Sequence, residues 1–206
     1  NGFFSQFNRN KRAISVDMKT AEGIAIVRKL ALSADVIFCN YRPAVADRLG
    51  FGYDSLREEN PGLIFVSVSG FGPDGPYAEQ PAYDLVIQGM SGTMTSQGQG
   101  VQPQMIRSVI ADKATAITAA SAALGALLAR ERSGGVGQHV HVPMVNAYAA
   151  LALPDIMSME SFRPKQELEP NIPDMFHVWS CNDGYLVGMP IEDKQYANLC
   201  TALGRE

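Results

Sequence analysis

The chain has 206 residues, of which 46% are apolar, and a formal net charge of −4 at neutral pH. This composition supports a packed core and excludes an intrinsically disordered chain. The scattered basic residues argue against nucleic-acid and anionic-membrane partners, and no apolar run reaches the roughly 18–20 residues of a membrane-spanning helix.

Strand and helix patterns alternate through the first third of the chain. The expected elements are strands at 13–17, 35–39 and 63–69 and helical segments at 20–32, 43–49 and 53–59. Thr20 is placed to cap the first of these helices, whose apolar residues recur with helical spacing. Because strands and helices alternate, we expect an α/β fold with a Rossmann-like parallel sheet flanked by helices.

The rest of the chain continues this pattern and then changes. We expect helices at 83–90, 113–132 and 143–153, a strand at 138–142, a hairpin of 176–180 with 185–189, and a helix at 192–203. The turn Asn182-Asp183-Gly184 is a typical hairpin signal. Pro and charged residues dominate 154–173, as in a connector. We therefore predict a large Rossmann-like domain (1–153), a linker (154–173) and the start of a smaller α+β domain (174–206).

Ligands of parallel sheets bind at the carboxyl ends of the strands. One such end carries Asn40 and Tyr41, where a backbone turn can approach a ligand. Arg48 follows on a short helix and offers a guanidinium fork for a phosphate. Alternatively, Arg48 is a solvated arginine on a helix surface.

A second strand end leads into a loop with Gly70, Gly72 and Gly75. These glycines permit a tight loop near a ligand, or they only mark a turn. Tyr83, which lies beyond the loop, is placed either to cover a reactive centre or simply to pack.

Asp112 stands where the polar loop 97–107 gives way to the alanine-rich helix 113–132. An acidic residue at such a point is ordinarily the N-cap of the helix. A catalytic role suits the same position, because a helix N-terminus stabilises a carboxylate and its free N–H groups help to hold developing oxyanions.

Several familiar motifs are absent. The sequence has no P-loop, and the glycines at 134–137 lead into a strand rather than a helix, so they are not a dinucleotide fingerprint. A plain nucleotide-binding Rossmann domain is therefore a weak alternative. Residues 67–70 lack the flanking glycine of a nucleophile elbow. His139 and His141 share one face of a strand but have no third ligand for a metal.

The three cysteines, Cys39, Cys181 and Cys200, lack metal-site spacing and cannot all pair with one another. We expect free thiols in a reducing, cytoplasmic compartment. The chain opens at Asn1 without a methionine or a signal peptide, and it stops just after a short helical pattern. Both ends indicate a segment of a longer protein.

Several segments, taken in order, resemble the family III CoA-transferases, a family that includes formyl-CoA and carnitine CoA-transferases and α-methylacyl-CoA racemases. The segments are Phe7 to Asp17, Asp35 to Pro43, Arg48 to Phe51, Ser69 to Tyr77, Tyr83-Asp84 and Arg132 to Gln138. Each motif is only moderately specific, whereas their common order is a strong signal. The resemblance covers essentially the whole chain, and members of the family are longer on both sides.

The resemblance implies that Asp112 is a covalent nucleophile, which forms an aspartyl mixed anhydride and then an enzyme–CoA thioester. It also implies that Asn40, Tyr41 and Arg48 contact CoA and that Tyr83 is an active-site tyrosine. From its place in the tight loop, we expect Gly70 to be a CoA-binding residue as well. CoA and acyl-CoA would be substrates, a small carboxylic acid the acceptor, and no cofactor tightly bound. Family members form interlocked homodimers.

The same resemblance leaves two activities to distinguish. Racemases of the family place a histidine where this chain has Tyr83. A tyrosine, with a pKa near 10, is a poor near-neutral base, so we expect a transferase. The alternatives are an α-methylacyl-CoA racemase or epimerase and a CoA-binding protein without catalysis. Pro81 replaces a lysine of the formyl-CoA transferases, which weakens a prediction of formyl or oxalate specificity.

Overall fold

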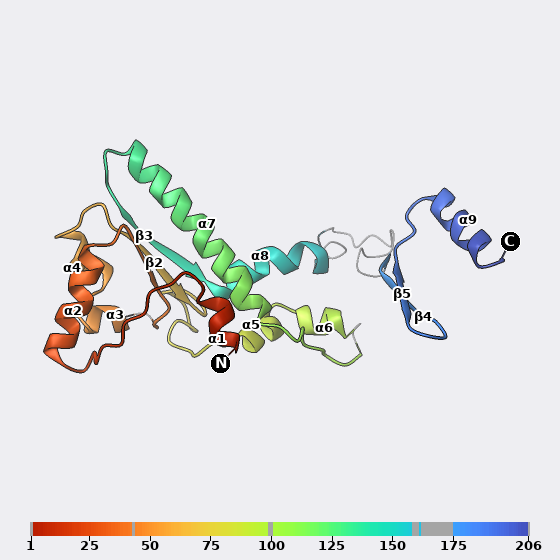
Figure 1. Ribbon diagram of the computed structural model, residues 1–206, viewed down its shortest axis with the longest axis horizontal. Helices are drawn as coiled ribbons and strands as arrows, with labels where there is room; N and C mark the ends of the chain where they lie inside the picture. The colour runs from red at the N-terminus through yellow and green to blue at the C-terminus, as the bar shows by residue number, and fades with distance from the viewer. Residues whose placement is uncertain (1, 43, 99–100, 158–160, 162–174, 206) are drawn as a thin grey trace.

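The computed structural model describes residues 2–42, 44–98, 101–157, 161 and 175–205 (Figure 1). Three parallel strands form a sheet in the order β1 (Val36–Cys39), β2 (Ile64–Ser69) and β3 (Gln138–Pro143). The helices are α1 (Gly2–Phe7), α2 (Ala21–Leu32), α3 (Val45–Arg48), α4 (Tyr53–Arg57), α5 (Asp84–Met90), α6 (Thr93–Gln97), α7 (Ile110–Arg132), α8 (Met144–Ile156) and α9 (Asp193–Ala202). The predicted α/β class with a parallel sheet is confirmed.

Strand β2 lies in the middle of the sheet, and its successive side chains point alternately to the two faces, each of which is covered by its own buried cluster. Ile64 and Val66 point to one face, where they join a buried cluster with alanines of α7. Leu63 and Phe65 point to the other face and pack with residues of α2 and α4. All four side chains are at most 2% exposed, and burying each contributes roughly 1.5–3 kcal/mol.

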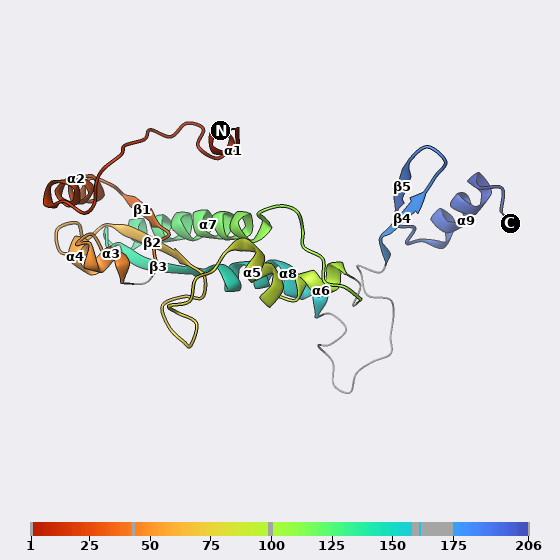
Figure 2. The same cartoon turned by 90° about the horizontal axis from the view of Figure 1, so that it is seen from below.

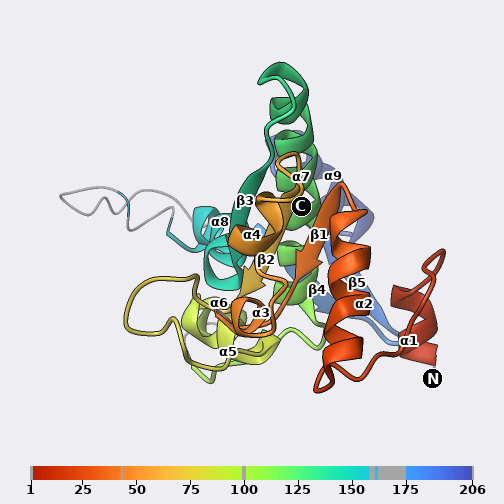
Figure 3. The same ribbon diagram turned by 90° about the vertical axis from the view of Figure 1, so that its left-hand side faces the viewer.

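Helix α7 runs along the first of these faces (Figure 2). It presents Ala119, Ala123 and Ala126, whose small side chains let the helix axis approach the strands. The helix ends at Arg132, and Gly134 follows with φ +77°, a left-handed conformation that favours glycine. The glycines thus end a helix before β3, as the sequence indicates. On the opposite side, α2 and α4 lie nearest the viewer in Figure 3.

The cap of α2 and the hairpin near the end of the chain form as predicted. The Thr20 hydroxyl accepts a hydrogen bond from the N–H of Gly23 at 3.0 Å and caps α2. Near the end of the chain, β4 (His177–Ser180) and β5 (Tyr185–Gly188) form the antiparallel hairpin, closed by a bond from the Cys181 N–H to the Gly184 carbonyl. The division into two domains stays a prediction, and residues 158–160 and 162–173 of the proposed linker lie outside the described residues.

Other expectations were wrong. Residues 13–17 alternate like a strand, but no described strand pairs with them, and a strand requires a partner for its backbone groups. Helix α6 begins in a stretch that carries no helical periodicity. Helix α7 begins three residues before the expected Lys113. Helix α8 continues to Ile156, past Leu153, with Pro154 inside its last turn, although proline has no N–H for the i→i−4 hydrogen bond.

Within the part of the chain that the structure describes, no helix combines the length and the apolar character needed to cross a bilayer.

Candidate active site

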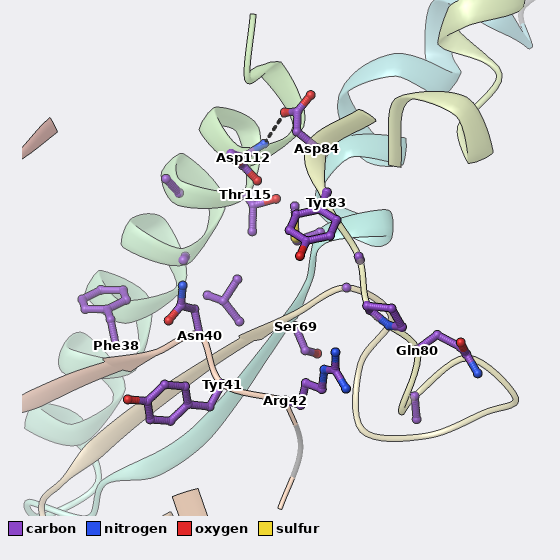
Figure 4. Close-up of a pocket in the computed structure, with 18 of the residues that line it drawn as sticks. Phe38, Asn40, Tyr41, Arg42, Ser69, Gln80, Tyr83, Asp84, Asp112 and Thr115 are labelled. Atoms are coloured by element: carbon purple, nitrogen blue, oxygen red, sulfur yellow. Dashed lines mark hydrogen bonds between the residues drawn. The ribbon is translucent and has the colours of Figure 1, made fainter. Parts of the chain in front are cut away.

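A cavity of about 650 Å³ opens at the carboxyl ends of the three strands, where α5 and α7 begin (Figure 4). Its lining includes Asn40, Tyr41, Gly70, Tyr83 and Asp112. The structure therefore brings together five of the six predicted site residues, although they are spread over more than 70 positions in the sequence. The cavity also lies at the edge of the sheet where ligands are expected.

Arg48 is the exception. It ends helix α3 and is exposed, and it is not among the described residues that line this cavity. Arg42, three residues after Cys39 and β1, lines the cavity instead, as do Ser69 and Gln80 (Figure 4). A contact between Arg48 and CoA stays a prediction.

Asp112 is held at the start of α7 by a residue from another helix. The N-cap position is Val109, whose side chain makes no capping hydrogen bond, and Asp112 is the third helical residue. Its backbone N–H donates to Oδ2 of Asp84 at 3.0 Å. The interpretation of Asp112 as an N-cap was therefore wrong. Asp84, the first residue of α5, supplies the oxygen that satisfies this free N–H group.

The surroundings of Asp112 make its carboxyl group less acidic. Partial burial raises the pKa of Asp112 above its ordinary value, and the negative charge of Asp84 raises this pKa further. The N-terminus of α7 acts in the opposite direction, because its free N–H groups favour a negative charge. A more basic carboxylate is a better nucleophile, provided that it remains ionised.

Tyr83 occupies the N-cap position of α5 in an extended conformation. It is 72% exposed, and Figure 4 shows its ring in the cavity between Asp112 and Ser69. The ring is therefore accessible to a ligand rather than part of the core. This placement favours the interpretation in which Tyr83 covers the site over the one in which it only packs.

Gly70 follows β2 directly and has an ordinary negative φ, so the need for glycine is not conformational. A Cβ atom added at Gly70 would lie 2.3 Å from Cβ of Ala82. Glycine is required here because the segment before Tyr83 crosses close to the end of the strand.

Two functional candidates were missed from the sequence as individual residues. Asp84 was noted only as part of a motif, and Gln88 was not considered. Gln88 Nε2 donates to Oδ1 of Asp84 at 2.5 Å. The signal was present, because Asp84 and Gln88 have the i,i+4 spacing at which carboxylate and amide side chains meet on a helix.

A second, smaller cavity of about 130 Å³ contains the two histidines of β3. Nε2 of His139 lies 2.7 Å from Oγ of Ser67, and the centroid of the His141 ring lies 4.0 Å from that of the His139 ring, with the two rings tilted by 42°. Burial lowers the pKa of His139, and His141 lowers this pKa further. In the described residues, no group of three or more histidine, cysteine or acidic side chains is arranged to hold a metal.

Comparisons with known proteins show the family of the chain. A family model described as CoA-transferase family III matches residues 1–206. The succinate–glutarate CoA-transferase of Agrobacterium fabrum is 39% identical over 98% of this chain and 51% of its own length. The acetyl-CoA:oxalate CoA-transferase of Acetobacter aceti is 34% identical over 98% of this chain and 53% of its own.

The fold is also similar to that of solved structures. A CAIB/BAIF family protein from Brucella suis superposes with a TM-score of 0.81 and 35% identity, over 96% of this chain and 53% of that protein. The chain thus spans about half the length of the relatives it matches.

Proposed function

The chain belongs to CoA-transferase family III, and on this basis we propose that the whole protein moves CoA from an acyl-CoA donor to a carboxylic acid acceptor, with Asp112 as the covalent nucleophile. The observation that carries the proposal is the position of Asp112. Its carboxylate lines a cavity of about 650 Å³ at the carboxyl edge of the sheet and at the N-terminus of α7. This volume is within the range of small-molecule sites.

The first half of the reaction uses Asp112 twice. Its carboxylate attacks the thioester carbonyl of the donor, CoA leaves as a thiolate, and a mixed anhydride forms. The thiolate then attacks the Asp112 carbonyl of this anhydride. The donor acid leaves as a carboxylate, and CoA is now held as a thioester on Asp112.

The second half reverses these steps with a new acid. The acceptor carboxylate attacks the Asp112 thioester, which expels the CoA thiolate and forms a second mixed anhydride. The thiolate attacks the acceptor carbonyl, so that a new acyl-CoA forms and the Asp112 carboxylate is free again. Each tetrahedral intermediate carries an oxyanion, and in this proposal the N-terminus of α7 helps to stabilise its negative charge.

The other residues of the cavity have supporting roles in this proposal. Asn40 and Tyr41 contact CoA at the end of β1, Gly70 allows the loop before Tyr83 to pass, and Tyr83 covers the acyl group. CoA enters as a substrate, and we propose no tightly bound cofactor. A homodimeric assembly and a cytoplasmic location belong to the proposal on the basis of the family resemblance.

Racemisation would require a second acid or base group opposite Asp112. Among the described residues, the three histidines all lie outside the Asp112 cavity. By the family resemblance, Tyr83 stands where the racemases carry a histidine. The lack of a histidine in this cavity supports acyl transfer over the exchange of an α-proton.

The deciding experiment is to trap the intermediate in the whole protein that carries this sequence. We would incubate it with a panel of acyl-CoAs, quench with hydroxylamine and map the modified peptide by mass spectrometry. We expect a hydroxamate on Asp112. Turnover without this adduct, together with uptake of solvent deuterium into a 2-methylacyl-CoA, would contradict the transferase and establish the racemase.

A further inference from the structure

Gln88 lies in the second turn of α5 and is fully buried, with 0% of its surface exposed. Its Oε1 accepts a hydrogen bond from the Ile106 N–H at 2.9 Å. Its Nε2 donates to Oδ1 of Asp84 at 2.5 Å and to the carbonyls of Ile106 and Ser108, both at 3.2 Å. An amide has only two N–H groups for these three acceptors, so one of them is shared.

These contacts reach Asp112 by two routes. The first route passes through Asp84, because Gln88 binds one oxygen of this carboxylate while the backbone N–H of Asp112 binds the other. The second passes through the chain itself, because residues 106–108 lead directly into α7. A shift of the Gln88 side chain would therefore move both the partner of Asp112 and the start of its helix.

The amide of Gln88 is buried together with its hydrogen-bond partners. Burying an amide is unfavourable unless it is hydrogen-bonded, and Gln88 meets this condition through Asp84 and the backbone of residues 106–108. An apolar residue of similar size would leave these backbone groups and the Asp84 carboxylate without this partner. The specific geometry of its bonds is what the glutamine provides.

We propose that Gln88 is a positioning residue: its amide fixes the Asp84 carboxylate and the 106–108 segment relative to each other, and thereby sets the place of Asp112. The inference rests on the proposed role of Asp112 as the nucleophile. Gln88 itself does not contact the substrate, because it is not among the described residues that line the cavity.

The matched control is Ser91, at the end of the same helix. Ser91 is 7% exposed, and its hydroxyl bonds to the Gln88 carbonyl at 2.9 Å and to the Thr93 hydroxyl at 2.9 Å. These bonds do not involve Asp84, residues 106–108 or Asp112. A Ser91→Ala variant thus removes buried polar contacts from α5 while it leaves the proposed positioning contacts in place.

The test compares Gln88→Met, Gln88→Glu and Ser91→Ala in the whole protein. Gln88→Met conserves volume but removes all four bonds. We expect faster hydrogen exchange across residues 104–112, a fall in kcat of up to about a hundredfold, as for a reacting group misplaced by about 1 Å, and a nearly unchanged KM for acyl-CoA. Ser91→Ala should leave the exchange of this segment and kcat close to wild type.

Gln88→Glu gives a readout that a loss of stability alone would not produce. The introduced carboxyl retains an acceptor for the Ile106 N–H, but it can donate to Asp84 only when it is protonated. The charged groups nearby are Asp84, Asp112, Arg107 and Lys113, of which Lys113 donates to the Ser108 hydroxyl. We expect this variant to recover activity relative to wild type as the pH falls.

The outcomes separate the two proposals. If Gln88→Met and Ser91→Ala have the same exchange rates over 104–112 and the same kcat, the positioning role is overturned, whatever the stability of either variant. If the wild-type protein turns over without an adduct on Asp112, the proposed mechanism fails, and hydrogen exchange alone still decides whether Gln88 fixes this segment.

Discussion

The carboxylate of Asp84 accepts a hydrogen bond from the backbone N–H of Asp112, so the first residue of α5 caps the first turn of α7 from 28 positions away. Both residues also line the same cavity. The charge of Asp84 raises the pKa of Asp112 in addition to the effect of burial. The position of the Asp112 backbone and the pKa of the Asp112 carboxyl group thus both depend on the Asp84 side chain.

Asp112→Asn should abolish turnover and stabilise the fold at neutral pH. Without the nucleophile, we expect a loss of about a thousandfold or more in kcat and no hydroxamate. Because the folded-state pKa of Asp112 is raised, the ionised carboxylate is a cost to stability at neutral pH, and the uncharged amide removes this cost. Denaturation curves of both proteins at neutral pH check the expected direction.

The pH dependence of this stability difference is the control. The wild-type carboxyl group is protonated in both folded and unfolded states below its ordinary pKa of 3.8. The advantage of Asp112→Asn should therefore fade as the pH falls through the raised folded value toward 3.8. An advantage that is equal at all pH values would show that it does not come from the titration of Asp112.

Asp84→Asn should shift the acid limb of the pH–rate profile to lower pH. The amide oxygen can still accept from the Asp112 N–H, but the negative charge that raises the Asp112 pKa is lost. Asp112 then ionises at lower pH and becomes less basic, so the plateau rate should fall as well. The measurement is kcat/KM against pH. An unmoved acid limb would mean that the charge of Asp84 does not influence the nucleophile.

Local patterns predicted most elements of this fold but not the start of α7. The helix is periodic and alanine-rich, and its end is marked by glycine, so its existence and its C-terminus could be found in the sequence. Its first residues, Ile110 and Ala111, follow Val109, which offers no capping side chain. The cap comes from Asp84, and a contact over 28 positions leaves no trace in a local pattern.

The wrong expectations for residues 13–17 and for helix α6 have a similar origin, because local patterns do not record contacts with the rest of the fold. Residues 13–17 have the alternation of a strand, but only pairing with another strand makes one. Helix α6 was missed because its sequence has weak helical propensity. It begins after Gly92, at φ +81°, and a buried hydrogen bond between the Ser91 and Thr93 hydroxyls supports its first turn. Site residues at strand ends could be predicted, because parallel strands gather their carboxyl ends at one edge.

His139 should make the fold sensitive to mild acid. Burial lowers its pKa, so below its ordinary value of 6.5 the unfolded chain binds more protons than the folded one. The contribution of neutral His139 to stability is then fully present above pH 6.5. It is lost as the pH falls through the lowered pKa of His139 in the folded state. His139→Gln, which can keep a hydrogen bond to Ser67, should show a smaller loss.

Chemical denaturation between pH 5 and 8 measures this effect. His177→Gln is the matched control, because it removes one histidine from strand β4 and leaves the His139–Ser67 pair intact. If wild type, His139→Gln and His177→Gln lose stability with the same slope, the buried histidine does not cause the acid sensitivity.

Gly70 and Ala82 should behave as a pair. In Gly70→Ala, the new Cβ would lie 2.3 Å from Cβ of Ala82, so the segment before Tyr83 must move away from the end of β2. Such overpacking costs about 1–3 kcal/mol of stability. Because the displaced segment carries Tyr83 and Asp84, we also expect lower turnover, measured together with thermal unfolding in the whole protein.

The double variant tests whether this contact is the cause. Ala82→Gly removes the clashing atom, and the next nearest atom, Cα of Ala82, is 3.6 Å from the added Cβ, an ordinary van der Waals distance. Ala82→Gly alone should cost roughly 0.5–1 kcal/mol through backbone entropy. Combined with Gly70→Ala, it should restore most of the turnover and stability, a clear departure from additivity. If the two losses simply add, glycine is needed at position 70 for a reason other than the passage of the Tyr83 segment.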